Sequence, residues 1–125
     1  MIKLKHLMDA VEKDDGTRIW IEPVGLTSDL KEWCEVDHVL CHLGPPMGLW
    51  EWFGEHPDGY EYFRGTYHEW LGKSRYKPAL RKLACAGQKE NITLLYQGDD
   101  PAHNTATALY EFLMELESYC SPDGE

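Results

Sequence analysis

Residues 92–104 constrain the fold most, because a strand pattern, a turn and a helix start follow one another there without interruption. The apolar run Ile92–Tyr96 is typical of a buried strand, and Gly98 with Asp99 marks a turn. The helix pattern that follows has apolar residues at three- and four-residue spacing: Ala106, Leu109, Leu113 and Leu116. In α/β proteins, ligands bind at the carboxyl ends of parallel strands, where helix N-termini point. We therefore expect a pocket at residues 97–104.

Length and charge limit the class of protein. The 125 residues fit one domain, which we predict over residues 1–120, followed by a disordered acidic tail at 121–125 that offers nothing to bury. A net charge of −10 disfavours nucleic acid as a partner. No apolar run approaches the ~20 residues of a membrane span, and Met1–Lys5 is too short and charged for a signal peptide. We predict a cytoplasmic protein without membrane partners.

The rest of the chain alternates between strand and helix patterns. Strands are expected from Ile2 onward and over Arg18–Glu22, and Val39–Cys41 fits a short buried strand. Stretches with helical spacing separate these strands, and such connections imply right-handed crossovers. The predicted fold is α/β: a compact three-layer domain with a mostly parallel sheet of about four strands flanked by helices.

The start of the last helix is the first candidate site. Asp100 suits the N-cap, Pro101 the first helical position and His103 the third. Free N–H groups and the helix dipole could hold an anion there. The same dipole would lower the pKa of His103 and keep the imidazole neutral, so that it could act as a base or hydrogen-bond donor.

The four cysteines show no recognisable framework: Cys34, Cys41, Cys85 and Cys120. They form no C-x-x-C pair, so we expect reduced thiols, some of them buried. Cys41 precedes His42, but neighbours on a strand face opposite ways, so a buried thiol is favoured over a nucleophile. No metal-ligand spacing is present, and we predict no metal site.

Several short motifs between Ile2 and Leu116 occur together. They are Ile2-Lys3-Leu4-Lys5, Asp15-Gly16 with Arg18, Trp52-Phe53-Gly54, Pro57 with Phe63-Arg64, Pro78-Ala79-Leu80, Thr93-Leu94-Leu95-Tyr96 and His103-Asn104. With these motifs the chain resembles the YeaO-like bacterial family, domain of unknown function 488. The resemblance implies a compact α/β fold and no particular reaction.

The segment after the second strand departs from that family. Members usually carry an Asp-Arg-Leu-Trp-Pro-Arg-Gly-like segment, where this chain has Glu22-Pro23-Val24-Gly25-Leu26. The acid is kept as Glu22, but both arginines and the tryptophan are missing. Guanidinium groups grip phosphate or carboxylate through two bonds, so the loss removes the natural anion clamps.

Glu22 and His103 are the candidate catalytic pair, because Glu22 closes a strand whose end would meet the same cleft. Gln97, Gly98, Asp99, Asn104 and Arg18 would bind the ligand. Two structural alternatives stay open. Glu22 could pair with Arg18 or a lysine, and His103 could bond to Glu22 or to backbone while Asp100 caps the helix.

Two classes of function remain. The first is a binding protein or enzyme for a small polar or anionic, nucleotide-like molecule, with the cofactor unknown. Its site would lie at the strand carboxyl ends. The second is a non-catalytic interaction or regulatory domain with a vestigial cleft, dimerising through the aromatic middle segment. In that segment Trp50 and Tyr62 fall off the main apolar stripes and could line a pocket for a flat ligand or form a dimer contact. The dinucleotide, P-loop and nucleophile-elbow signatures are all absent.

Overall fold

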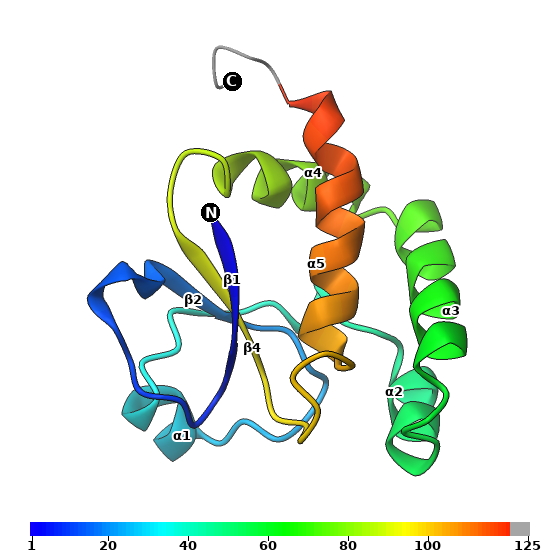
Figure 1. Ribbon diagram of the computed structural model, residues 1–125, viewed down its shortest axis with the longest axis horizontal. Coiled ribbons are helices and arrows are strands. Elements are labelled where there is room, and N and C mark those ends of the chain that lie inside the picture. The colour runs from blue at the N-terminus through cyan, green and yellow to red at the C-terminus, as the bar shows by residue number, and fades with distance from the viewer. Residues whose placement is uncertain (121–125) are drawn as a thin grey trace.

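The computed structural model describes residues 1–120, and the predicted tail at 121–125 lies outside them. The chain forms a sheet and helices that succeed one another along the sequence (Figure 1). The strands are β1 (Ile2–His6), β2 (Thr17–Trp20), β3 (His38–Val39) and β4 (Ile92–Tyr96). The α-helices are α1 (Ser28–Trp33), α2 (Met47–Glu55), α3 (Tyr60–Lys73), α4 (Lys77–Ala86) and α5 (Thr105–Leu116). Short 3-10 helices are η1 (Lys13–Asp15), η2 (Cys41–Leu43) and η3 (Glu117–Tyr119).

All four strands form one parallel sheet in the order β1-β4-β2-β3. The last strand, β4, is therefore central: Ile92 pairs with Ile2 of β1 on one side and with Thr17 of β2 on the other. Every residue of β4 is buried, including Thr93, as its largely apolar sequence predicts. The predicted parallel α/β fold is confirmed.

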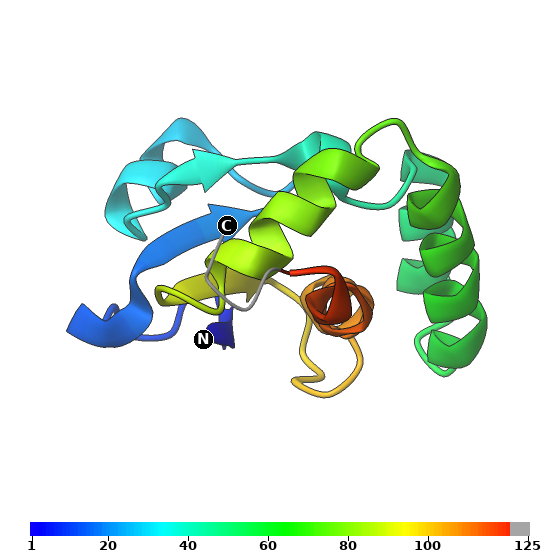
Figure 2. The ribbon, with the colours of Figure 1, turned by 90° about the horizontal axis from the view of Figure 1, so that it is seen from above.

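Alternation along the strands produces two apolar faces. Ile19 and Leu94 point to the face covered by α3, α4 and α5, which we call the α5 face. Trp20 and Leu95 point to the opposite face, where Cys34 at the end of α1 packs, and which we call the α1 face. Figures 1 and 2 show α1 at one end of the molecule and the α2–α3 pair at the other. The sheet therefore lies between helices, as predicted.

β3 differs from the expected buried strand. It covers only His38 and Val39, both exposed, and Cys41 already begins η2. β3 pairs only with β2 and forms an edge of the sheet, so its side chains are less covered than those of the central strands. The short strand that the sequence allowed at Val39–Cys41 is thus present at His38–Val39, and it is exposed instead of buried.

The cysteines also differ from the expectation, because Cys85 and Cys120 form a disulfide with a Cα–Cα separation of 5.5 Å. Cys85 lies in the last turn of α4, and Cys120 directly follows η3. Spacing along the chain does not show that α4 packs against the end of α5, which brings these two residues together. Cys34 is free and buried, as expected, whereas the free Cys41 is exposed.

The lengths of the helices can be compared with the length that a membrane span requires. Within residues 1–120, the longest helix is α3, with 14 residues. None of the helices in this range has the length and apolar character that a bilayer crossing requires.

Candidate functional site

A cavity of about 320 Å³ opens at the carboxyl ends of β2 and β4. These strands are neighbours in the sheet, so the residues that follow them meet at one edge. Glu22 comes from the β2 side, and the other predicted residues come from the segment between β4 and α5: Gln97, Gly98, Asp99, His103 and Asn104. The structure thus brings six of the seven predicted site residues to one pocket.

The position of the pocket follows from the path of the chain. After β4 the chain continues into α5, which packs on the α5 face, whereas after β2 it continues into α1 on the opposite face. Two neighbouring parallel strands that send their connections to opposite faces leave a crevice between their ends, the usual ligand position in open α/β sheets.

Glu22 is buried, and both of its carboxylate oxygens accept hydrogen bonds. Oε1 accepts from the Trp50 indole Nε1 at 3.0 Å, and Oε2 accepts from the Gln97 backbone N–H at 3.0 Å. Burial raises the pKa of Glu22, while these two donors and Thr105 oppose that rise. The carboxylate therefore joins the ends of β2 and β4 to α2. Arg18 and His103, which were predicted as possible partners of Glu22, do not contact it.

His103 is half exposed and belongs to a short polar loop. Its Nδ1 lies 2.8 Å from Oδ2 of Asp100, and its ring centroid lies 4.8 Å from that of Tyr60. The hydrogen bond from His103, together with the Ala102 backbone N–H, lowers the pKa of Asp100. His103 thus bonds to a carboxylate in its own loop, while its ring lines the pocket.

Asn104, not Asp100, is the N-cap of α5. Its Oδ1 accepts from the Thr107 backbone N–H at 2.8 Å, and its Nδ2 donates to the Asp100 carbonyl at 2.9 Å. The helix begins at Thr105, so His103 lies outside its first turn. The prediction that placed Asp100, Pro101 and His103 at the helix start is wrong, and the argument from the dipole to a neutral His103 no longer applies.

The cap assignment gives a first testable prediction. Asn104→Ala is expected to lower the free energy of unfolding by about 1 kcal/mol, because one helix N–H loses its acceptor. Urea denaturation monitored by circular dichroism measures the change. Asp100→Ala is the control and should have the smaller effect, since its side chain does not cap α5. A larger loss for Asp100→Ala than for Asn104→Ala would contradict the cap assignment.

Three carboxylates contribute to the pocket, from Glu22, Asp99 and Asp100. Among the lining residues that the structure describes, none is lysine or arginine. The opposite wall is largely apolar, with Trp50, Phe53 and Pro57. A cavity that combines acidic groups with aromatic walls favours neutral or cationic ligands over anions.

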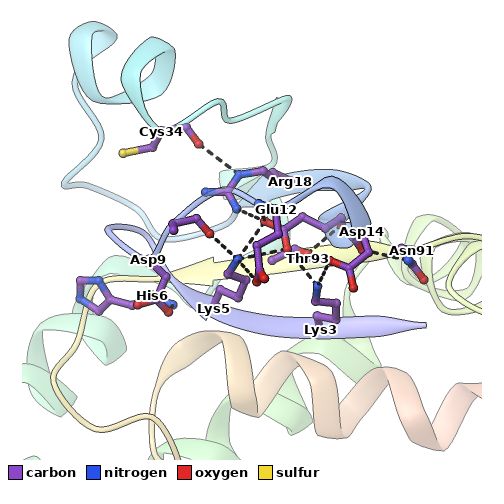
Figure 3. Close-up of polar contacts among 12 residues, drawn as sticks. Lys3, Lys5, His6, Asp9, Glu12, Asp14, Arg18, Cys34, Asn91 and Thr93 are labelled. Carbon is purple, nitrogen blue, oxygen red and sulfur yellow. Dashed lines mark hydrogen bonds and ion pairs between the residues drawn. The ribbon is translucent and has the colours of Figure 1, made fainter.

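Arg18 is the predicted site residue that lies elsewhere. It faces the α1 side of β2 and is buried, with Nη1 2.6 Å from Oδ2 of Asp15 and Nε donating to the Cys34 carbonyl. Lys3 and Lys5 also place their ammonium groups 3.0 Å from the same carboxylate. Figure 3 shows these cations gathered around the β1–β2 connection. Arg18 therefore belongs to a buried ion cluster, which we call the Asp15 cluster, and does not line the pocket.

Trp50 lines the pocket, which is one of the two roles expected for it from sequence, whereas Phe53 was expected only in the core. Trp50 falls off the apolar stripe of its helix, and this was the available signal that it makes a specific contact. Cys41 is not poised as a nucleophile. Although the residue as a whole is exposed, partial burial of the sulfur raises the pKa of its thiol, and Sγ donates to the Glu22 carbonyl at 3.2 Å. Within residues 1–120, one set of acidic side chains lies close enough together to hold a metal ion: Glu12, Asp14 and Asp15. Lys3 and Lys5 of the Asp15 cluster form ion pairs with these carboxylates.

The fold and pocket define a small parallel α/β protein with a crevice at the carboxyl edge of its sheet. The chain belongs to the DUF488 family: residues 1–121 match the family model described as "Inactive DUF488-N3 subclade". This match confirms the resemblance to the YeaO-like family. No curated protein and no solved structure gave a match.

Proposed function

We propose that this protein binds a small molecule carrying an amine or amide donor and a flat apolar part, and performs no reaction on it. The observation that carries the proposal is the composition of the 320 Å³ cavity, which has three carboxylates and aromatic walls. Its volume lies at the small end of ligand pockets, which fits a molecule of one or two rings.

The acidic lining sets the charge of the ligand. Asp99 and Asp100 are exposed at the mouth, while Glu22 is buried at the base. An anionic ligand would meet carboxylates without a compensating lysine or arginine, whereas an ammonium or amide N–H would find acceptors. Of the small polar or anionic, nucleotide-like ligands expected from sequence, we therefore exclude the anionic ones and propose a neutral or cationic ligand.

The hydrogen-bond partners of Glu22 and His103, the candidate catalytic pair, support a binding role without a reaction. Both oxygens of Glu22 accept structural hydrogen bonds, and His103 bonds to Asp100 instead of to Glu22. General acid–base work by this pair would need the two groups to converge on one substrate proton, whereas Glu22 is buried between Trp50 and Gln97 and His103 is held by its own loop. The subclade that the chain matches is described as inactive.

A thermal-shift screen tests the proposal, with aromatic amines and amides compared against carboxylates and phosphates of similar size. Ligand at about 100 times its dissociation constant should add about 2.7 kcal/mol, raising the midpoint by several degrees in a domain of this size. We expect amines to raise the midpoint and the Asp99→Asn/Asp100→Asn variant to lose most of that response. Asparagine keeps an acceptor oxygen for the His103 contact, so the loop should survive.

The matched control removes the same number of negative charges at positions far from the pocket. Asp29→Asn/Glu32→Gln alters two exposed acids on α1 and should leave the response to amines unchanged. If carboxylates or phosphates raise the midpoint instead, or if both variants lose the response equally, the proposed ligand class is wrong.

A further inference from the structure

Basic residues concentrate in one segment of this acidic chain. Residues 73–89 contain six of its 12 lysines and arginines and no aspartate or glutamate, although the net charge of the chain is −10. This segment includes all of α4. Leu80 and Ala84 are buried on the side of α4 that faces the core. The solvent-facing side carries the exposed Arg81 and Lys82, and Lys89, also exposed, follows the helix.

These three cations line a groove of about 670 Å³ along α4. Pro78, Cys85 and Ala86 contribute apolar surface to the same groove, and Glu90 is the single acid that lines it. Within residues 1–120, Arg81, Lys82 and Lys89 form no ion pair with an acidic side chain. The groove therefore offers positive charge that the described part of the chain does not neutralise.

The second wall of the groove is held in place covalently. Tyr119 of η3 lines the groove, with its ring centroid 5.4 Å from the Arg81 guanidinium carbon. The adjacent Cys120 is bonded to Cys85 of α4, so η3 is fixed against that helix. Figure 1 shows the end of α5 crossing α4 at this point. A wall fixed in this way needs little further ordering when a partner binds.

We propose that this groove is the docking site for a short acidic peptide segment, with at least one apolar side chain, of a partner protein. From Pro78 to Ala86 the helix rises about 12 Å, the length of about four residues of extended chain. Basic side chains on either side of an apolar strip match carboxylates that flank an apolar anchor. This site lies on α4 and is separate from the small-molecule pocket.

A peptide fits this surface better than nucleic acid does. Nucleic acid presents a phosphate on every nucleotide and would bring a long polyanion close to the acidic remainder of the chain. A segment of a few residues places its carboxylates only at the groove. The apolar strip also provides a contact that a phosphate backbone does not use.

The test is fluorescence anisotropy with a labelled Glu-Glu-Leu-Glu-Glu-Leu peptide and the intact, oxidised protein. Arg81→Glu/Lys82→Glu should weaken binding by about tenfold or more, because two attractive contacts become repulsive. The control Lys13→Glu/Lys31→Glu makes the same charge change at exposed positions on η1 and α1, away from α4 (Figure 2). It should alter the affinity much less.

Three results would overturn the proposal. The first is no binding of the peptide at millimolar protein, and the second is an equal loss of affinity in the two charge variants, which would indicate general electrostatic attraction. The third is tighter binding of a single-stranded oligonucleotide than of the peptide at the same ionic strength. Circular dichroism of both variants confirms that each is folded, and Arg81→Gln/Lys82→Gln should bind with intermediate affinity.

Discussion

Replacing Asp15 with alanine is expected to lower the free energy of unfolding by about 3–5 kcal/mol. The Asp15 side chain is fully buried and balances Arg18, which is also buried, together with Lys3 and Lys5. Without the carboxylate, a buried guanidinium and two half-buried ammonium groups lose their common partner. Urea denaturation at neutral pH measures the loss.

Asp14→Ala is the matched control for this prediction. Asp14 contacts the same Lys3, but its side chain is 72% exposed, so its removal should lower stability by at most about 1 kcal/mol. Similar losses for the two variants would show that the Asp15 cluster does not stabilise the β1–β2 connection.

The Asp15 cluster also predicts how stability depends on pH. Burial alone would raise the pKa of Asp15, but hydrogen bonds from Lys3, the Glu12 backbone and Lys5 hold it well below its usual range. The pKa is therefore lower in the folded than in the unfolded chain. The contribution of Asp15 is fully present above the unfolded value of about 3.9 and is lost as pH falls toward the folded value. The difference in stability between wild type and Asp15→Asn should narrow below about pH 4.

Removing the Cys85–Cys120 disulfide is expected to destabilise the protein by about 2–4 kcal/mol. The bond closes a loop with a sequence separation of 35, and opening it increases the conformational freedom of the unfolded chain. Thermal unfolding with and without a reductant measures the effect, and the Cys85→Ala/Cys120→Ala variant should match the reduced wild type.

Cys41→Ala provides the control for the disulfide. Cys41 forms no disulfide and lies at the surface, so this variant should keep the wild-type midpoint to within a few degrees and the full sensitivity to reductant. A wild-type protein whose midpoint does not change on reduction would contradict the stabilising role assigned to the bond.

The core of the fold could be predicted because its signals are local. The largely apolar β4 sequence and the helical spacing of α5 identify both elements, and strands separated by helices imply a parallel sheet. Once the sheet is parallel, the ends of β2 and β4 must lie on one edge, which is why Glu22 and Gln97 were expected together. The position of β4 between β1 and β2 depends on long-range pairing that no local pattern reveals.

The misplacement of Arg18 illustrates the limit of residue-type reasoning. Arg18 and Glu22 are four residues apart, about 13 Å along an extended chain, so they could not both reach the carboxyl edge. Strand geometry alone could have excluded Arg18 from the pocket. Its actual partner, Asp15, lies at the opposite end of β2.

The start of α5 was misplaced because two capping patterns compete there. Asp100-Pro101 and Asn104-Thr105 each fit an N-cap followed by a first helical residue. The structure selects Asn104, while Asp100 organises the loop through His103 and Ala102. The disulfide and the Trp50–Glu22 bond could not be predicted for another reason: both join segments that only the packed fold brings together.

Dimerisation through the aromatic middle segment stays a prediction. Tyr62 is 61% exposed, as its place off the apolar stripe suggested, whereas Trp50 is partly buried by its contact with Glu22. The free surface of this segment is therefore smaller than the sequence suggested.

The Trp50 indole N–H provides the most direct test of the proposed binding pocket, because it lines the cavity and donates to Glu22. Its NMR resonance, assigned with Trp50→Phe, can be followed while the protein is titrated with benzylamine or with benzoate. These probes share an aromatic ring and differ in charge. We predict that benzylamine shifts the indole and Gln97 amide resonances saturably, whereas benzoate does not. Shifts caused by benzoate, or by neither compound, would contradict a pocket that selects amines.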